Sequence, residues 1–323
     1  MVALKYARDW LALDASLKCG TSRFSLVRER DVVEVKYCGQ IGNQLFQYCL
    51  GRIIAERLGF ELFAPPIPGF PGTFEKVSGA NYRKMQTATY RGQTIDMTSI
   101  LADKSPRHII LEGYFQRYEY FQEHETVIKK VWLKLPDDSI PLQPVEDVLV
   151  HVRRGDYLTK YYWALLPFSF YTRLLDSMMP ATVRIVTDSP DDPFVRRLAQ
   201  RYVAPVTSGD PLTDFALLAS SRNIILSQST YAWWAGYLSS AARVYYPIPI
   251  TGYWSLHSEI DLRVLDPRYE YVRCTDVYRM TLREVLLYYR WPPTRLVKEL
   301  AHWGWYRIRR LVNLLRARAL RIG

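Results

Sequence analysis

Short β-rich segments alternate with helix-like segments through the second half of the chain. Each short segment is rich in valine, isoleucine or leucine and ends at a turn, and the next segment carries apolar residues at helical spacing. Strands and helices that alternate in this way indicate βαβ units and a parallel sheet. The predicted strands are 148–152, 183–187, 223–227 and 243–246, and the predicted helices are 167–179, 194–202, 211–220 and 231–240.

The first half of the chain shows the same pattern less regularly. Residues 32–37 alternate as a strand and enter a glycine-bearing turn, after which apolar residues at helical spacing end at Gly59. Residues 108–112 form a further predicted strand, and a helix is expected over 118–132. Residues 63–73 are rich in proline and glycine, so we predict a loop there.

Length and composition suggest two domains with flanking segments. A chain of 323 residues is long enough for two domains, each with its own core. Residues 136–144 contain three prolines and two aspartates, which is typical of a linker. We therefore predict an N-terminal extension (1–31), an α/β domain (32–145), a second α/β domain (146–276) and a tail (277–323).

The composition also narrows the class of protein. With 49% hydrophobic residues, the chain is expected to be globular. Its four cysteines show no Cys-x-x-Cys and no paired histidine spacing, which argues against a zinc site or a disulfide framework and fits a reducing compartment. We find no apolar run of about 18 residues and no signal-peptide plan in residues 1–30. The expectation is a protein that is neither secreted nor membrane-spanning.

The positive charge is concentrated in the tail. Residues 277–323 hold 11 basic and 2 acidic residues, which accounts for nine of the eleven net positive charges. Apolar residues fall on one face of a predicted helix there, with arginines around them, namely Ile308, Leu311, Val312, Leu315 and Ala319 against Arg309, Arg310, Arg316, Arg318 and Arg321. Such a helix favours an anionic membrane surface. The alternatives are a helix that packs on its own domain and a nucleic-acid-binding tail.

One predicted strand runs directly into two arginines. Strand 148–152 contains His151 and is followed by Arg153, Arg154, Gly155 and Asp156. Guanidinium groups make planar, bidentate hydrogen bonds that suit phosphate. Gly155 permits a sharp turn where a ligand approaches, and the Asp156 carboxylate either fixes a guanidinium or acts on a substrate hydroxyl. The alternative is an Arg–Asp pair at a domain boundary.

Other polar residues stand where predicted strands give way to helices. Asn43, Ser229 and Thr230 lie near helix starts, where they either cap the helix or bind a ligand through free backbone N–H groups. Asp188 follows strand 183–187 and either begins the next helix or faces the ligand crevice at the carboxyl end of a parallel strand. The sequence alone leaves both alternatives open.

Four motifs in order resemble one known family. They are Gly-Gln-Ile-Gly-Asn-Gln-Leu-Phe-Gln-Tyr (39–48), Glu-Gly-Tyr-Phe-Gln (112–116), His-Val-Arg-Arg-Gly-Asp-Tyr (151–157) and Ser-Thr-Tyr-Ala-Trp-Trp-Ala-Gly-Tyr-Leu (229–238). Together they resemble the α-1,2-fucosyltransferases of glycosyltransferase family 11, of the bacterial type. The resemblance implies a GT-B architecture, with two Rossmann-like domains facing across a cleft. It also implies GDP-β-L-fucose as donor and inversion to an α-linkage without a metal ion or other cofactor.

The resemblance assigns the second domain to the donor and the first to the acceptor. It implies that Arg153 holds the β-phosphate, with support from Arg154 and His151, and neutralises the leaving GDP. The remaining implied contacts are Asp188 and Asp214 to ribose or guanine, Ser229 and Thr230 to the pyrophosphate, and Asn43 to the sugar or phosphate from the opposite domain.

The sequence departs from the family pattern at two places. Some related fucosyltransferases outside the family carry a glutamate about ten residues after the arginine pair. Residues 158–175 contain no carboxylate here, so Asp156 is the nearest candidate for the general base. Gln228 stands where asparagine is expected, and we predict an effect on loop packing.

The acceptor is inferred from the family alone. The resemblance implies O-2 of a terminal galactose, and the basic tail suggests a lipid-linked oligosaccharide at the cytoplasmic face of a bacterial membrane. The loops over 63–91 are expected to form the acceptor pocket. The alternatives are another GDP-sugar, another linkage or acceptor, and a nucleic-acid-binding protein with a basic tail; for the preferred function no nucleic acid is expected.

Overall fold

The computed structural model describes residues 31–73, 86–105, 108–134, 146–159, 165–248, 253–276 and 278. The predicted N-terminal extension up to residue 30, the linker 136–144 and the basic tail, apart from Tyr278, lie outside the described residues. Within the described part of the chain, none of the helices has both the length and the apolar character needed to cross a bilayer.

The first half of the chain forms a four-stranded parallel sheet in the order β2-β1-β4-β3. Its strands are β1 (Val32–Val35), β2 (Glu61–Phe63), β3 (Thr87–Gly92) and β4 (His108–Gly113). Its helices are α1 (Ile41–Leu58), α2 (Met97–Ala102) and the short α3 (Glu125–Val127). Helix α1 packs closely on this sheet, since a Cβ at Gly51 would lie 2.4 Å from the Val35 side chain.

Three sequence predictions for this half need correction. Strands β2 and β3 both overlap the segment 63–91 that was predicted as loop. They are outer strands, and β3 is largely exposed and polar, so neither carries the apolar alternation of a buried strand. The helix predicted over 118–132 is broken into the 3-10 turns Tyr118–Tyr120 and Gln122–His124, helix α3 and the π-helical turn Ile128–Trp132.

The second half forms a six-stranded parallel sheet in the order β10-β9-β8-β5-β6-β7. Its strands are β5 (Val148–Val152), β6 (Val183–Thr187), β7 (Val206–Thr207), β8 (Asn223–Ile225), β9 (Arg243–Ile248) and β10 (Tyr269–Arg273). Its helices are α4 (Phe168–Met178), α5 (Pro193–Tyr202), α6 (Pro211–Ala219), α7 (Thr230–Leu238) and α8 (Tyr253–Leu256).

This strand order is that of a Rossmann fold. Counted from β5, the sheet reads 3-2-1-4-5-6 from β7 to β10, with the reversal between β5 and β8. All strands and helices predicted from residue 148 to residue 246 are present, and β7 and β10 add the two outer positions that the sequence did not predict. The α/β fold class with two parallel sheets is confirmed.

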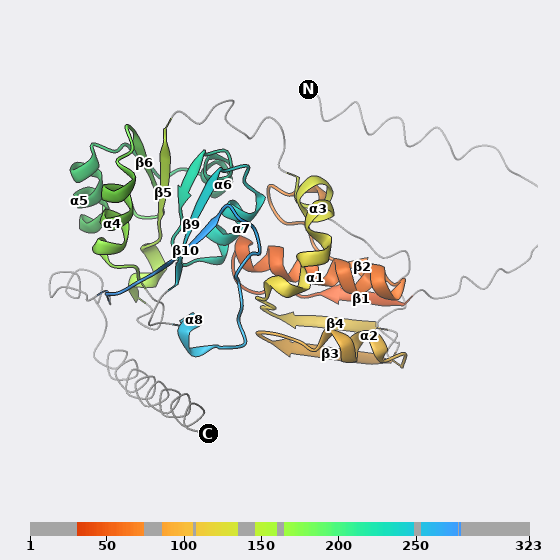
Figure 1. Cartoon of the computed structure of the whole chain (residues 1–323). Coiled ribbons are helices and arrows are strands. Elements are labelled where there is room, and N and C mark those ends of the chain that lie inside the picture. Colours follow the sequence, from red (N-terminus) through yellow and green to blue (C-terminus); the bar gives the residue numbers. More distant parts are fainter. Residues whose placement is uncertain are drawn as a thin grey trace, which may run out of the picture.

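The two halves meet through α1 and α7, which lie side by side between the sheets (Figure 1). The Phe46 ring on α1 lies 4.8 Å from Trp233 and 4.9 Å from Trp234 on α7, measured between ring centroids. All three side chains are fully buried. An aromatic core therefore fixes the N-terminal half of α1 relative to α7.

Candidate active site

The arginine pair lies at the point where the strand order of the second sheet reverses. Strands β5 and β8 are neighbours, and the chain leaves their carboxyl ends in opposite directions. Ligands of open parallel sheets bind outside the carboxyl ends of the strands at such a point. Arg153 follows β5 directly, and the segment after β8 leads into the N-terminus of α7.

Arg153 is held by carboxylates on both sides. Its Nη2 atom lies 2.6 Å from Asp156 Oδ1, and its Nη1 atom lies 2.9 Å from Asp188 Oδ2. The guanidinium also reaches the first domain, where Nη2 donates to Gln40 Oε1 at 3.4 Å. The side chain remains 19% exposed. The Arg–Asp pair at a domain boundary is therefore present, on a guanidinium that is still accessible to a ligand.

Arg154 lies in a different environment from Arg153. Its side chain is 1% exposed, and its Nε atom donates to Asp192 Oδ2 at 3.1 Å. Its Nη2 atom donates to the hydroxyl of Tyr278 at 2.9 Å, and the guanidinium carbon lies 4.6 Å from the centre of the Phe194 ring. Burial alone would lower the pKa of Arg154, but the interactions with Asp192 and Tyr278 are stronger and raise it. The structure does not bring Arg154 to the exposed group around Arg153.

The turn after β5 is fixed by the turn after β6. Asp188 Oδ1 accepts the backbone N–H of Arg154 at 2.9 Å, and Ser189 Oγ accepts that of Gly155 at 2.9 Å. A Cβ at Gly155 would lie 2.3 Å from Asp188 Oδ2. Gly155 is therefore required by the close approach of a carboxylate. Asp188 thus binds both the backbone of this turn and the Arg153 side chain.

His151 is a neutral neighbour of this group. The residue is 4% exposed, its Nδ1 atom lies 2.6 Å from Ser227 Oγ, and its ring lies 5.6 Å from that of Tyr231. Burial, and to a lesser extent the charge of Arg153, lower the pKa of His151 to about 3. The imidazole therefore contributes hydrogen bonds and packing but no positive charge near neutral pH.

The remaining predicted donor contacts occupy two helix starts. Ser229 caps α7, since its Oγ accepts the backbone N–H of Ala232 at 3.0 Å, and Thr230 is the first residue of that helix. Asp214 lies in the first turn of α6, where it accepts the backbone N–H of Gly209 at 3.1 Å. Asp214 is 7% exposed, and burial raises the pKa of its carboxyl group.

The first sheet presents uncharged amides at its corresponding point. Strands β1 and β4 are neighbours, and the chain leaves their carboxyl ends toward α1 and toward Gln116. Asn43 Oδ1 accepts a hydrogen bond from Gln116 Nε2 at 3.0 Å. The interpretation of Asn43 as a helix cap is wrong, because the cap residue of α1 is Gln40. Sequence reasoning assigned no role to Gln116, although it ends the motif 112–116.

The two groups are brought together by a close contact between helix starts. A Cβ on Gly42 of α1 would lie 2.4 Å from the backbone nitrogen of Tyr231 and 2.6 Å from the carbonyl carbon of Thr230. Glycine at this position lets the first turns of α1 and α7 touch. The contact explains how Gln40 comes within reach of Arg153.

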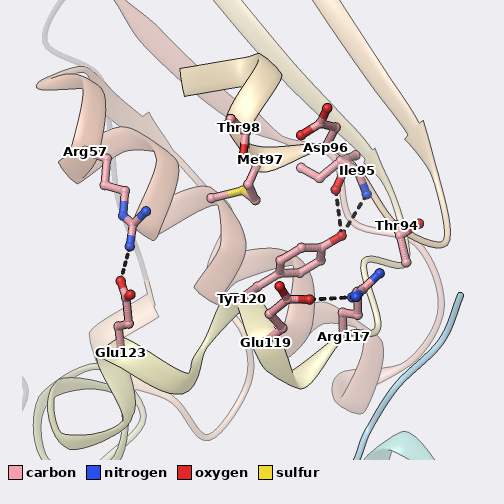
Figure 2. Close-up of a pocket in the computed structure, with 10 residues that line it drawn as sticks. All are labelled: Arg57, Thr94, Ile95, Asp96, Met97, Thr98, Arg117, Glu119, Tyr120 and Glu123. Carbon is pink, nitrogen blue, oxygen red and sulfur yellow. Dashed lines mark hydrogen bonds and ion pairs between the residues drawn. The ribbon is translucent and has the colours of Figure 1, made fainter. Parts of the chain in front are cut away.

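A pocket of about 550 Å³ lies on the first domain, and Arg117, the residue after Gln116, is among those that line it (Figure 2). Ion pairs join Arg57 to Glu123 and Arg117 to Glu119, and the Tyr120 hydroxyl is bonded to the backbone of Ile95. The ten residues that line the pocket include none that the sequence analysis assigned to the donor site. The polar groups labelled in Figure 2 are thus largely bonded to one another.

Comparison with known proteins identifies relatives by sequence. The family model for glycosyl transferase family 11 matches residues 78–253. A galactoside 2-alpha-L-fucosyltransferase of Caenorhabditis elegans is 28% identical over an alignment of 174 positions, and the match covers 46% of this chain and 48% of that protein. The galactoside 2-alpha-L-fucosyltransferase SEC1 of Bos taurus is 23% identical over an alignment of 238 positions, and the match covers 64% of each chain. The chain thus spans 48% and 64% of the length of these two relatives.

Solved structures show a more distant similarity. The fucosyltransferase NodZ from Bradyrhizobium is 13% identical, with a TM-score of 0.44 over 67% of this chain and 95% of that chain. FUT1 of Arabidopsis thaliana is 9% identical, with a TM-score of 0.45 over 68% of this chain and 71% of that chain.

Proposed function

The chain belongs to glycosyltransferase family 11, and from this premise we propose that it transfers L-fucose from GDP-β-L-fucose to O-2 of a terminal galactose, with inversion and without a metal ion. The observation that carries the proposal is the position of Arg153. A partly exposed guanidinium, fixed by two carboxylates, stands at the point of the Rossmann-type sheet where nucleotides bind.

Arg153 is suited to the departure of GDP. Negative charge develops on the diphosphate as the bond to fucose breaks, and a guanidinium already held in place stabilises that charge with little reorganisation. Asp156 and Asp188 supply the fixed geometry. Ser229 and Thr230, at the start of α7, are the further donors that we assign to a phosphate, since a helix start attracts anions.

Arg154 receives a different role from the one implied by the resemblance, and for Asp156 we choose between the two roles that the sequence left open. We assign Arg154 to the support of the turn after β5, because its guanidinium is buried against Asp192 and Tyr278. We assign Asp156 to the orientation of Arg153, because its Oδ1 atom lies 2.6 Å from Nη2 of that guanidinium. An oxocarbenium-like transition state makes stabilisation of the leaving group the larger requirement in this reaction.

The experiment is product formation from GDP-fucose with a panel of β-galactosides, in the presence of EDTA, for the wild type and Arg153→Ala. We expect transfer to O-2 of galactose that survives EDTA and falls by about 100- to 1,000-fold in the variant. Arg196→Ala is the matched control, because Arg196 is an exposed arginine on α5 that pairs only with Asp191 among the described residues.

Other outcomes separate the alternatives. Turnover with GDP-mannose but not with GDP-fucose would retain the site and replace the donor. Hydrolysis of GDP-fucose without transfer would retain the donor and reject the galactoside acceptor. Failure of the wild type both to bind GDP and to use GDP-sugars would reject the proposed function.

We also propose that the basic residues of the tail bring the enzyme to an anionic membrane surface, where a lipid-linked glycan is the acceptor. The support is the charge of residues 277–323 in the sequence. Vesicles with anionic lipids should bind the full-length protein and release it when Arg309, Arg310 and Arg316 are replaced by glutamine. Equal binding of both proteins would contradict this proposal.

A further inference from the structure

The strongest feature without an assigned role is the turn that carries Gln116. It follows β4 at the carboxyl end of the first sheet, beside the turn that leads into α1. The side chain of Gln116 is bonded to Asn43, and Gln40, three residues before Asn43, meets Arg153 of the other domain. The turn therefore lies at the amide side of the junction between the domains.

The backbone of this turn is strained. Phe115 has a φ of +53°, in the left-handed region that residues other than glycine avoid. Its side chain is fully buried. Among the described residues, Met179 and Val203 share this conformation, but both are exposed and end helices. A buried aromatic residue held in this conformation is the kind of strain that accompanies functional sites.

The side chain of Gln116 is buried and only partly bonded. The residue is 4% exposed, and its Nε2 atom donates to Asn43 Oδ1 at 3.0 Å. Its Oε1 atom has no hydrogen-bond partner among the described residues. Since a buried amide oxygen without a partner costs free energy, the turn is poorly explained by stability alone.

The hydrogen bond from Gln116 decides which atom Asn43 offers. Because Asn43 Oδ1 is the acceptor for Gln116, its Nδ2 atom is left as a donor on the other side of the carboxamide. That atom lies against Gly39, where a Cβ would be 2.2 Å away and where φ is +76°. Asn43 is half-buried, whereas Gln116 is buried.

We propose that Gln116 is a positioning residue that fixes the Asn43 carboxamide with Nδ2 as the donor to a sugar hydroxyl. The hydroxyl belongs either to the fucose of the donor or to the acceptor sugar, and the experiment distinguishes the two. The proposal rests on the proposed fucosyl transfer. Neutral amides are suited to a neutral hydroxyl, as the guanidinium of Arg153 is to a diphosphate.

The test uses Gln116→Glu in the full chain. A carboxylate accepts hydrogen bonds and does not donate them, so the pair re-forms when the Asn43 carboxamide turns over and Nδ2 donates to it. The atom offered to the sugar then becomes an oxygen. Asn43→Asp also places an oxygen there while Gln116 is unchanged. Both variants should reduce kcat/KM for transfer by about 10- to 100-fold and leave the affinity for GDP within about two-fold of the wild type.

Two readouts identify the hydroxyl. If it belongs to fucose, the variants lose affinity for GDP-fucose relative to GDP. If it belongs to the acceptor, GDP-fucose affinity and its slow hydrolysis are kept, and the KM for the galactoside rises. Either result supports the positioning role.

Gln47→Glu is the matched control, since Gln47 is a fully buried glutamine of α1 whose Nε2 atom donates to the Cys38 carbonyl at 3.0 Å. It should lower Tm without a selective loss of sugar recognition. If Gln116→Glu lowers only Tm, as this control does, or leaves transfer unchanged in an active enzyme, the inference is overturned while the proposed function stands. An inactive wild type that does not bind GDP would instead reject the proposed function itself.

Discussion

The carboxyl ends of the two sheets are built from opposite chemistry. On the second sheet the exposed group consists of Arg153, Asp156 and Asp188, which we call the charged rim. On the first sheet the corresponding residues are Gln40, Asn43 and the buried Gln116, which we call the amide rim. One hydrogen bond, from Arg153 to Gln40, joins the two.

The difference between the two rims corresponds to two tasks of a transferase, which are to bind a diphosphate and to bind sugar hydroxyls. Ionic groups at the charged rim are already paired with one another, so a guanidinium is available in fixed geometry when a diphosphate arrives. The amides of the amide rim carry no net charge, so they recognise hydroxyl groups through the geometry of their hydrogen bonds. We infer that the two Rossmann-like halves, though similar in architecture, are suited to different ligand groups, the second half to a diphosphate and the first half to sugar hydroxyls.

We expect the largest loss of stability from Arg154→Ala, which tests whether Arg154 belongs to the charged rim. Arg154→Ala leaves the carboxylate of Asp192 buried without its guanidinium, and we expect the free energy of unfolding to fall by about 3–5 kcal/mol. Arg153→Ala should change it by less than about 1 kcal/mol, because Arg153 is more exposed. Urea denaturation of both variants gives the comparison. A stable Arg154→Ala protein that no longer binds GDP would place Arg154 at the ligand instead.

The next loss of stability is expected from a change at the contact between α1 and α7, which holds the two rims together. Gly42→Ala would put a methyl group 2.4 Å from the backbone nitrogen of Tyr231, so α1 and α7 must move apart. We expect a loss of about 1–3 kcal/mol in the free energy of unfolding. Transfer should decrease more than GDP binding, since the charged rim is complete within one domain. Gly59→Ala is a control without steric conflict, because nothing lies within 4 Å of a Cβ there, although its φ of +69° adds strain. Wild-type transfer by Gly42→Ala would show that the rims need not meet closely.

A pH titration tests the neutrality of His151. Its pKa is about 3 in the folded protein and about 6.5 in the unfolded chain. The unfolded state therefore binds the proton more readily, and stability present above pH 6.5 is lost as the pH falls toward 3. At pH 5 the free energy of unfolding should be lower by about 2 kcal/mol because of His151. The variant His151→Gln should lack this part of the pH dependence. An unchanged pH dependence in His151→Gln would mean that folding does not lower the pKa of His151.

The smallest effect concerns the support behind the charged rim. Tyr278→Phe removes the hydroxyl that accepts from Arg154 Nη2 and keeps the ring that packs on the guanidinium. We expect a loss of about 1 kcal/mol in the free energy of unfolding. The KM for GDP-fucose should change little, because Arg154 does not reach the exposed group. A large rise in KM with unchanged Tm would show that the Tyr278 hydroxyl acts on the donor site itself.

The sequence predicts the second domain well because its strands are buried and regular. The apolar segments that became β5, β6, β8 and β9 are distinctive, and the turn residues between them mark the helices. Strands β2, β3, β7 and β10 were missed because outer strands are short or polar and obtain their pairing from the neighbouring strand.

The residues of the site were predicted less completely. The motif 151–157 correctly marks the end of β5, but two adjacent arginines look alike in sequence and only the fold shows that one turns toward Asp192. Gln116 was missed because its importance depends on a contact with a residue 73 positions away. The motif 112–116 was the available signal, and it carried no chemistry that the sequence alone could interpret.

The most direct test of the division between the rims is calorimetric titration of GDP into the wild type, Arg153→Ala and Gln116→Glu. We expect Arg153→Ala to reduce GDP affinity by at least about ten-fold. We expect Gln116→Glu to bind GDP like the wild type and yet to transfer fucose inefficiently. Equal GDP affinity in the wild type and Arg153→Ala, or loss of GDP binding in Gln116→Glu, would contradict it.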